Sequence, residues 1–332
     1  MKCRKCKAPA EVPLPSHNTA FCRDCFAIYF TGQVDKAIRR FGLINPGERV
    51  LVALSGGKDS LSLMLELSRM GFDVTGLHVD LGIPVSSPAA RAKVEGFCTL
   101  HGLKLTVVEL ARQGLPIPDV KRYINRPVCS ACGKIKRHWF NRVALEGGFQ
   151  VLATGHNLDD EVARLFANTL RWDAGYLSDQ GPCLEAESGF ARKIKPFYRL
   201  TEFETACYAF LNGIEIHTAP CPYSGGASFT GHKQLWANLE HTSPGTKIAF
   251  YDGFLKRGQP AFAHIEQQSG AALAPCEQCG SPTSTGLCGV CRLGIAVAER
   301  RAADPDRLSG PDRESGPAKP SIAENSANPH CS

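Results

Sequence analysis

The chain has 332 residues, of which 43% are hydrophobic and 21% charged, values typical of a globular protein. No apolar stretch reaches the ~20 residues that a transmembrane helix needs, and the N-terminus lacks the apolar segment of a secretion signal. We therefore expect a cytoplasmic protein without a membrane partner, whose fifteen cysteines serve metal ligation or thiol chemistry rather than disulfides. The net charge is +6; the tail after Ala303 contributes −2, so the rest carries +8, which favours a polyanionic partner.

The first thirty residues contain two Cys-x-x-Cys pairs with fifteen residues between them. Two such pairs can supply four thiolates to one tetrahedral ion, and a segment this short has little other means of folding. We predict an N-terminal zinc finger over residues 1–30, with a rubredoxin-like iron site as the alternative. Its ligands would be Cys3, Cys6, Cys22 and Cys25.

A continuous apolar run at residues 50–54 predicts a fully buried strand. It leads into Ser-Gly-Gly-Lys-Asp-Ser at residues 55–60, where glycines permit a sharp turn and a close approach of backbone amides to a ligand. We expect Ser60 to open a helix whose free N–H groups face the loop. The sequence therefore predicts a phosphate-binding loop, although it lacks the Walker spacing.

Short strand-like runs then alternate with helical segments. Strands are predicted at 50–54, 74–79, 103–110 and 149–153, and helices at 61–69, 89–100 and 134–145. This alternation predicts an α/β fold with a doubly wound parallel sheet, whose ligands bind at the carboxyl ends of the strands. Three segments follow such ends: the loop at 55–60, residues 77–80, where backbone groups could hold an adenine edge, and residues 154–157.

Three consecutive acidic residues occupy the predicted first turn of the helix after Asn157, which is a good N-cap. Acidic residues suit the positive end of a helix without any further function. This turn also follows a strand end where phosphates would bind, and carboxylates beside phosphates hold Mg²⁺. We favour the functional interpretation for this acidic turn.

Residues 121–142 contain seven basic residues, no acidic residue and interleaved aromatic side chains. A solvated face would mix both signs of charge, so this segment indicates a surface for the phosphates of a polyanionic partner. The candidate contacts to that partner are Lys121, Arg122, Arg126, Lys134, Arg137 and Arg142.

Cys129 and Cys132 form a Cys-x-x-Cys within this basic segment, and Cys221 lies between two prolines further along the chain. Three thiolates can hold a [4Fe–4S] cluster and leave one iron open. Two alternatives stay open: a catalytic cysteine pair with a third thiol, and a zinc site with a fourth ligand such as His232.

Residues 193–199 are expected to form an edge strand or turn, before a helix that begins at Thr201 with Glu204 at capping-box spacing. Residues 228–256 are expected to be helical with a break at Pro244-Gly245, and Lys233 there could face RNA. We assign residues 31–262 to one catalytic domain.

A second pair of Cys-x-x-Cys motifs predicts a C-terminal zinc ribbon over residues 270–300. Its ligands would be Cys276, Cys279, Cys288 and Cys291. The tail at 303–332 is rich in Pro, Ser, Gly and Asp and is predicted to be disordered.

Several of these motifs resemble those of known enzymes. Ser-Gly-Gly-Lys-Asp-Ser resembles the PP-loop of the adenine nucleotide alpha hydrolases, which cleave ATP to AMP and pyrophosphate. Gly-His-Asn-x-Asp-Asp resembles the second signature of PP-loop tRNA-modifying enzymes. In their order along the chain, the motifs resemble the tRNA 2-thiouridine synthetase family, most closely its TtuA branch, which thiolates 5-methyluridine 54 of tRNA. A relative that thiolates wobble uridine 34 shares most of these motifs.

The resemblance implies an ATP-dependent tRNA sulfurtransferase that works as a homodimer. It implies that Cys129, Cys132 and Cys221 hold the [4Fe–4S] cluster, and that a ubiquitin-like protein with a C-terminal thiocarboxylate donates the sulfur. Lys136 and Asp160 match positions that the family treats as catalytic. The ATP-binding residues would be Ala53, Ser55, Gly56, Gly57, Lys58, Asp59, Ser60, Val79, Gly155 and His156.

The implied chemistry begins with attack of the uridine O2 on the α-phosphate of ATP, which expels pyrophosphate. Mg²⁺ and cations must stabilise the growing charge. Lys58 suits the leaving pyrophosphate, Asp59 and Asp160 suit Mg²⁺, and Lys136 could polarise the α-phosphate or the base. Sulfide then displaces AMP. Two alternatives remain: a persulfide enzyme without a cluster, and a non-catalytic, zinc-dependent RNA-binding module.

Overall fold

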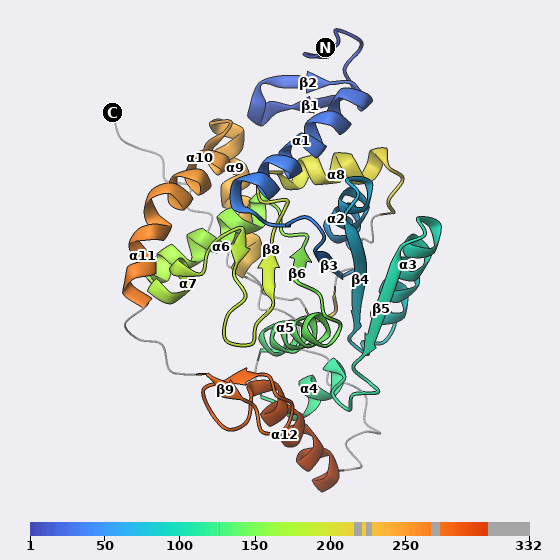
Figure 1. The fold of residues 1–332 in the computed structure, drawn as a ribbon, viewed down its shortest axis with the longest axis vertical. Coiled ribbons are helices and arrows are strands. Elements are labelled where there is room, and N and C mark those ends of the chain that lie inside the picture. The colour runs from blue at the N-terminus through green and yellow to red at the C-terminus, as the bar shows by residue number, and fades with distance from the viewer. Residues whose placement is uncertain (126, 216–220, 224–227, 267–272, 305–332) are drawn as a thin grey trace, which may run out of the picture.

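The computed structural model describes residues 1–125, 127–215, 221–223, 228–266 and 273–304. Its centre is a six-stranded sheet in the order β5-β4-β3-β6-β8-β7 (Figure 1). All neighbouring strands are parallel except β7 and β8. The sheet contains β3 (Arg49–Leu54), β4 (Asp73–Asp80), β5 (Lys104–Glu109), β6 (Val151–Thr154), β7 (Cys183–Leu184) and β8 (Arg192–Ile194). The predicted doubly wound α/β fold is confirmed.

The chain runs outward from β3 to β4 and β5 and then returns to β6 on the other side of β3. The strand order therefore reverses between β3 and β6, and ligands of such sheets bind beside the carboxyl ends at this point. The helices around the sheet are α2 (Lys58–Arg69), α3 (Ser86–Leu100), α4 (Ile117–Tyr123), α5 (Val128–Glu146), α6 (Leu158–Arg171), α7 (Ala174–Ser178) and α8 (Glu202–Leu211).

The side chains of β3 alternate between two hydrophobic cores. Val50, Val52 and Leu54 face a core shared with α1 (Arg23–Phe41) and α2. Leu51 and Ala53 face a second core, built on α4 and α5. Burial on both faces explains why this strand is continuously apolar in the sequence.

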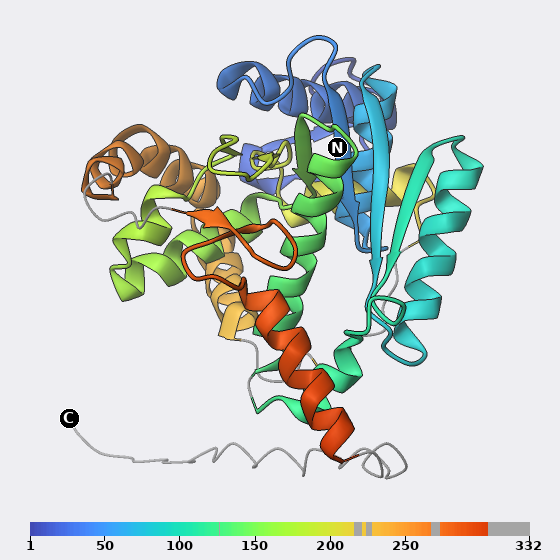
Figure 2. The same ribbon diagram turned by 60° about the horizontal axis from the view of Figure 1, so that its bottom comes forward.

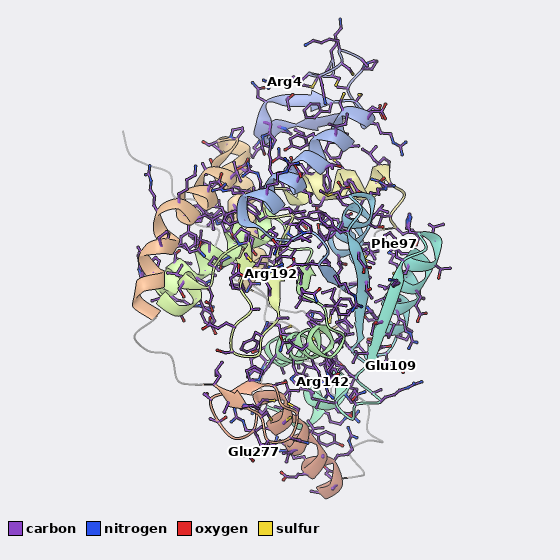
Figure 3. The ribbon with its side chains drawn as sticks, viewed as in Figure 1. Arg4, Phe97, Glu109, Arg142, Arg192 and Glu277 are labelled. Atoms are coloured by element: carbon purple, nitrogen blue, oxygen red, sulfur yellow. The ribbon has the colours of Figure 1, made fainter. Side chains whose placement is uncertain are left out.

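Two small four-cysteine units lie at opposite ends of the molecule, as Arg4 and Glu277 mark in Figure 3. The N-terminal unit has a hairpin of β1 (Val12–Leu14) and β2 (Thr19–Phe21), with a 3₁₀ turn, Pro15–His17, between them. The C-terminal unit has β9 (Ala274–Pro275), β10 (Pro282–Thr283) and α12 (Gly289–Ala303), which packs on α4 and α5 (Figure 2). The helix α1 crosses the predicted boundary at residue 30, so the first unit and the sheet domain share one helix.

The remaining helices are α9 (Ser228–Thr242), α10 (Thr246–Gly253), a π-helical turn (Phe254–Gly258) and α11 (Gln259–Glu266), which pack beside α6 and α7. The break at Pro244-Gly245 and the capping box of Thr201 with Glu204 are as predicted. Most of the tail expected to be disordered, residues 305–332, lies outside the described residues. Within the described residues, no helix is both long and apolar enough to cross a bilayer.

Two local predictions were wrong, and a third was correct only in part. Helix α2 begins at Lys58 rather than Ser60, because Gly57 is the N-cap and the Ser60 hydroxyl turns back to bond the Gly57 carbonyl at 3.0 Å. Helix α5 begins six residues before the expected Lys134, directly after Pro127. For residues 193–199, the predicted turn is present at 196–199, but the strand before it, β8, lies between β6 and β7 and is not at the sheet edge.

Glu161 of α6 is fully buried and must be neutralised there, because burial disfavours its charged form. Its Oε2 accepts from Lys195 Nζ at 2.7 Å, Tyr251 Oη at 2.8 Å and Gln180 Nε2 at 2.9 Å. Burial acts to raise the pKa of this carboxyl, but the Lys195 ammonium, His156 and the hydrogen bonds from Lys195 and Tyr251 together outweigh it, and the pKa is lowered. This pair fixes the first turn of α6 to the end of β8.

Replacing Lys195 by Met should leave a buried carboxylate without its cation and cost about 3–5 kcal/mol of the free energy of unfolding. Urea unfolding monitored by circular dichroism measures the loss. The matched control is Arg39→Met, which removes the exposed pair with Asp35, because exposed pairs contribute roughly 0–1 kcal/mol. Equal midpoints for the two variants would contradict a structural role for the Glu161–Lys195 pair.

Candidate active site

The loop between β3 and α2 has the geometry of an anion cradle. Gly56 has φ +81°, a conformation that favours glycine, and a Cβ there would lie 3.3 Å from the Ala90 carbonyl oxygen. The Ser60 hydroxyl lies 3.2 Å from both the Ser55 amide and the Ser55 hydroxyl, which closes the loop on itself. The N-terminal amides of α2 consequently face the carboxyl ends of the strands.

Gly155 is required by the close approach of two segments distant in the sequence. A Cβ at this position would lie 2.8–2.9 Å from the Asp59 carbonyl and the Ser60 nitrogen. Any side chain here would therefore push the end of β6 away from the start of α2. This explains why Gly155 follows the strand that neighbours β3.

A cavity of about 440 Å³ opens at this junction, within the size range of small-molecule sites. Ala53, Val79 and His156, three predicted ATP-binding residues, line it together with Lys136 of α5 and Cys221. The other predicted ATP-binding residues on its wall are Ser55, Asp59, Ser60 and Gly155. We name it the nucleotide cavity.

Two histidines in the nucleotide cavity are held by their neighbours. His78 Nδ1 lies 2.9 Å from the Leu54 carbonyl, and His156 Nδ1 lies 2.9 Å from the Thr154 hydroxyl. Burial lowers the pKa of both, that of His156 to about 3. Both imidazoles are therefore neutral at pH 7 and supply hydrogen-bonding groups rather than positive charge.

Only one of the three consecutive acidic residues lines the cavity. Asp159 accepts from Lys247 Nζ at 2.5 Å and from the Glu202 amide at 2.8 Å, and Glu161 pairs with Lys195. Asp160 lines the cavity while its Oδ2 caps the helix by accepting from the Asn157 amide at 3.1 Å. Asp159 and Glu161 thus form internal ion pairs with lysines. Of the three acids, Asp160 is the one left that could bind Mg²⁺ in the nucleotide cavity.

A network of charges joins the predicted catalytic groups. Lys58 Nζ lies 2.8 Å from Asp59 and 3.4 Å from Glu202 of α8. Asp59 Oδ1 also accepts from Thr205 Oγ1 at 2.5 Å and from Asn157 Nδ2 at 3.3 Å. Side chains from α8 and from the N-cap of α6 therefore converge on Lys58 and Asp59, the first two residues of α2.

Lys233 of α9 completes this network. Its ammonium lies 2.6 Å from Asp160 and 3.1 Å from Glu202, and these carboxylates raise its pKa against the opposing effect of burial. The expectation that Lys233 faces RNA was wrong, because the side chain turns inward. Sequence reasoning also missed Glu202, since a lone acid at a helix start is usually only a capping group.

The three cysteines predicted to hold a cluster come from two segments. Cys129 and Cys132 lie in the first turn of α5, and Cys129 Sγ donates to the Tyr223 carbonyl at 3.3 Å, two residues beyond Cys221. Burial raises the pKa of Cys132, as do the charges of Cys221 and Cys129, while Lys136 opposes them. Cys129 and Cys221 are exposed, and Cys132 is half-buried. The structure does not support a zinc site that includes His232, because the imidazole packs perpendicular to the Phe166 ring, with 5.4 Å between the ring centroids.

The residues predicted to contact RNA lie in three different environments. Arg142 pairs with Glu146 at 2.7 Å and lies 5.1 Å from the Trp139 ring, so its charge is engaged locally. Lys134 and Arg137 line a second cavity, described below. Lys121 is exposed on α4, next to Arg122, and Arg126 lies outside the described residues.

Both four-cysteine groups are suited to a metal ion. Within each group, all four sulfur atoms lie within 4.8 Å of one another. In the second group the Cys288 amide donates to Cys276 Sγ at 3.2 Å, and such backbone bonds lower the pKa of Cys276 to about 6. A thiol that ionises this easily is ready to bind a cation.

The fold and cavity define a class of protein: an α/β domain with a PP-loop, flanked by two four-cysteine groups. Residues 30–214 match the PP-loop domain family, and residues 2–27 match the family described as "2-thiouridine synthetase TtuA, N-terminal LIM domain".

Similar proteins specify the family further. The tRNA-5-methyluridine(54) 2-sulfurtransferase of Thermus thermophilus is 42% identical over 93% of this chain and 97% of its own. That of Thermotoga maritima is 36% identical over 92% and 100%. The solved U34-tRNA thiolase NcsA from Methanococcus maripaludis, with its [4Fe-4S] cluster, superposes with a TM-score of 0.71 at 28% identity, covering 89% of this chain and 96% of that one. The chain belongs to the TtuA family of tRNA 2-thiouridine synthetases.

Proposed function

We propose that this protein is an ATP-dependent tRNA 2-sulfurtransferase that replaces O2 of 5-methyluridine 54 with sulfur. The observation that carries the proposal is the convergence, in one cavity, of the PP-loop, Lys136 and a cysteine of the predicted cluster. Relatives named for modification at position 54 are 36–42% identical to this chain, which favours that target over uridine 34.

Each residue has a role in this reaction. The loop amides and Lys58 bind the β- and γ-phosphates, which leave as pyrophosphate when the uridine O2 attacks the α-phosphate. Lys136 reaches the same cavity from α5 and stabilises the charge on the α-phosphate or on O2. Asp59 and Asp160 are the carboxylates on the cavity wall that would hold Mg²⁺. The base must leave its stack to enter.

Cys129, Cys132 and Cys221 would hold a [4Fe–4S] cluster, which supplies an open iron for the incoming sulfide. Three thiols from two segments, with Cys221 on the cavity wall, suit such a cluster at the point where AMP must be displaced. The two four-cysteine groups would each hold Zn²⁺, which suits four thiolates in a tetrahedral arrangement.

The remaining partners follow from the chemistry and from the family. Sulfide needs a donor, which we propose is a ubiquitin-like carrier with a C-terminal thiocarboxylate. We also propose that the enzyme is a cytoplasmic homodimer, since its tRNA substrate is found there.

Pyrophosphate release tests the proposal directly. Anaerobically purified protein, given ATP, sulfide and a tRNA that carries 5-methyluridine 54 without a 2-thio group, should release pyrophosphate and AMP and form one 5-methyl-2-thiouridine, located by nuclease mapping with mass spectrometry. Absence of tRNA-dependent pyrophosphate would leave a non-catalytic RNA-binding module as the better account. Full activity in a colourless, iron-free preparation would instead exclude the cluster from the reaction.

A further inference from the structure

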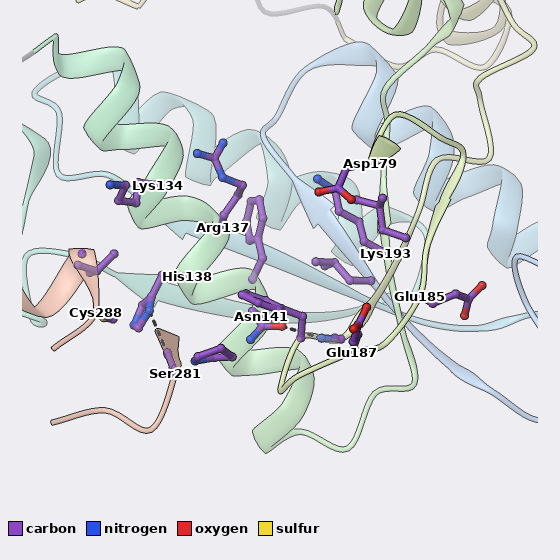
Figure 4. Close-up of a pocket in the computed structure, with 18 residues that line it drawn as sticks. Lys134, Arg137, His138, Asn141, Asp179, Glu185, Glu187, Lys193, Ser281 and Cys288 are labelled. Carbon is purple, nitrogen blue, oxygen red and sulfur yellow. Dashed lines mark hydrogen bonds between the residues drawn. The ribbon is translucent and has the colours of Figure 1, made fainter. Parts of the chain in front are cut away.

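A second cavity, of about 610 Å³, lies on the opposite side of α5 from Lys136. Its walls are α5, the segment around β7 and β8, and the C-terminal four-cysteine unit (Figure 4). Phe140 lines both this cavity and the nucleotide cavity, so the two adjoin. We name it the α5 cavity.

The walls of the α5 cavity are fixed by hydrogen bonds. Asn141 Oδ1 accepts from the Ala191 amide at 2.7 Å, and Asn141 Nδ2 donates to the Gly189 carbonyl at 3.1 Å. Ser281 of the C-terminal unit lies 3.3 Å from His138 Nδ1. These bonds connect three separate parts of the chain, so the cavity is a defined feature of the fold.

Three cations project into the α5 cavity: Lys134 and Arg137 from α5, and Lys193 from β8 (Figure 4). No described carboxylate lies within ion-pair distance of any of the three, whereas most basic residues near the active site are paired. The start of α12, a positive helix end, lies on the same wall, with Lys134 against Gly289. These three cations therefore have no carboxylate ion-pair partner among the described residues.

Lys193 occupies a position where the fold alone would place an apolar residue. It pairs in the sheet with Leu152 of β6 and Leu184 of β7, which line the same cavity. Burial, with Lys195 and other nearby cations, lowers its pKa to about 7. The side chain is only half-buried by surface area, but the open part faces the cavity. A charge kept at such a site without an ion-pair partner weakens the fold, so a binding function would account for its presence.

The lining also carries the exposed carboxylates of Glu185 and Glu187, on the segment between β7 and β8. Carboxylates repel a free phosphate but accept hydrogen bonds from ribose hydroxyls and base amino groups. Apolar side chains, among them Phe140 and Phe190, complete the lining and offer surface to a base. Cations, carboxylate acceptors and aromatic walls together match a ribonucleotide.

We propose that the α5 cavity binds a nucleotide adjoining the target uridine, with a backbone phosphate on Lys134, Arg137 and Lys193; this rests on the function proposed above. Helix α5 directs Lys136 to the nucleotide cavity and directs Lys134 and Arg137 to the α5 cavity. A tRNA strand that crosses α5 would therefore occupy both cavities. The C-terminal four-cysteine unit forms one wall of the α5 cavity, so it also contributes to binding the tRNA strand.

Lys193→Met separates this proposal from a structural role. Met has a similar length and suits the apolar neighbours, so the variant should fold and bind ATP as the parent does, while its affinity for the tRNA falls at least tenfold. The slope of log affinity against log salt should decrease by about 0.7–0.9, the loss of one phosphate contact. The matched control is Lys104→Met, a substitution at a 74% exposed side chain on β5.

Thermal stability provides a second readout: the substitution that lowers tRNA affinity should raise the melting temperature. Because the pKa of Lys193 is lower in the folded state than in the unfolded chain, protonation of this residue opposes folding below about pH 7, and the effect disappears towards pH 10.5. Lys193→Met should therefore melt at a higher temperature than the parent at pH 6, with a smaller gain at pH 9. The charged and titratable groups around Lys193 are Lys195, Arg164, Glu161, Arg137 and His156, besides Asp179 of the cavity lining, and they are the same in both proteins.

A Lys193→Met protein with unchanged tRNA affinity and a lower melting temperature would overturn the proposal and make Lys193 structural. So would unchanged tRNA affinity with weakened binding of a peptide ending in Gly-Gly carboxylate, because the cavity would then receive a protein tail. Failure of the parent to release pyrophosphate with tRNA would refute the enzymatic function, while the direct tRNA-binding measurement would still test the cavity.

Discussion

Replacing Cys221 by Ala should abolish thiolation and remove the iron–sulfur cluster, while the fold survives. Cys221 is exposed, so its truncation removes no buried packing and should change the free energy of unfolding by less than about 0.5 kcal/mol. With only Cys129 and Cys132 left, two irons would lack a protein thiolate. Iron and sulfide content and visible absorption after anaerobic purification measure the cluster, and nucleoside mass spectrometry measures thiolation.

The control for this substitution is Cys288→Ser in the C-terminal four-cysteine group. It should lower the zinc content by one ion per chain and weaken tRNA binding, while the iron content stays that of the parent. A Cys221→Ala protein with full iron would exclude Cys221 from the cluster. Equal loss of iron from both variants would mean that the cysteines are assigned to the wrong metals.

The order and kind of the main elements could be predicted because their signals are local. A buried parallel strand is recognisable as a continuous apolar run, and Ser-Gly-Gly marks the turn that follows it. The paired Cys-x-x-Cys motifs specify their own partners by spacing, and both sets gather as predicted. The capping boxes at Asn157 and Thr201 are likewise encoded within four residues.

Contacts between distant segments could not be predicted. Nothing local distinguishes Asp160, which lines the cavity, from Asp159 and Glu161, whose partners Lys247 and Lys195 lie 88 and 34 residues away. Nothing local distinguishes Lys193 from the other basic residues around it either. Its position between two leucines appears only once β8 is placed in the sheet. Charge alone suggested RNA for Lys233, whereas its position on α9 makes it a partner of Asp160.

Replacing Lys233 by Met should lower kcat for pyrophosphate release by about 10²–10³, the effect of removing one preorganised charge-stabilising group. Asp59, Asp160 and Glu202 bring three carboxylates to the place where the triphosphate must bind, and Lys233 offsets two of them at 2.6 and 3.1 Å. Without it, carboxylate repulsion should also raise KM for ATP. Affinity for tRNA should hold, because the side chain faces the carboxylates and not the surface.

Lys233→Arg distinguishes a charge requirement from a packing requirement at this position. Arg keeps the cation and should restore most of kcat, since Lys233 is still 26% exposed and has room for a longer group. Lys256→Met, at an exposed lysine that follows α10, is the matched control and should behave as the parent. A Lys233→Met enzyme with normal kcat and KM would show that α9 merely covers the site. A loss that Arg restores would make Lys233 a positioning residue for Asp160, tying the helix that follows the Cys221 segment to the chemistry of the loop.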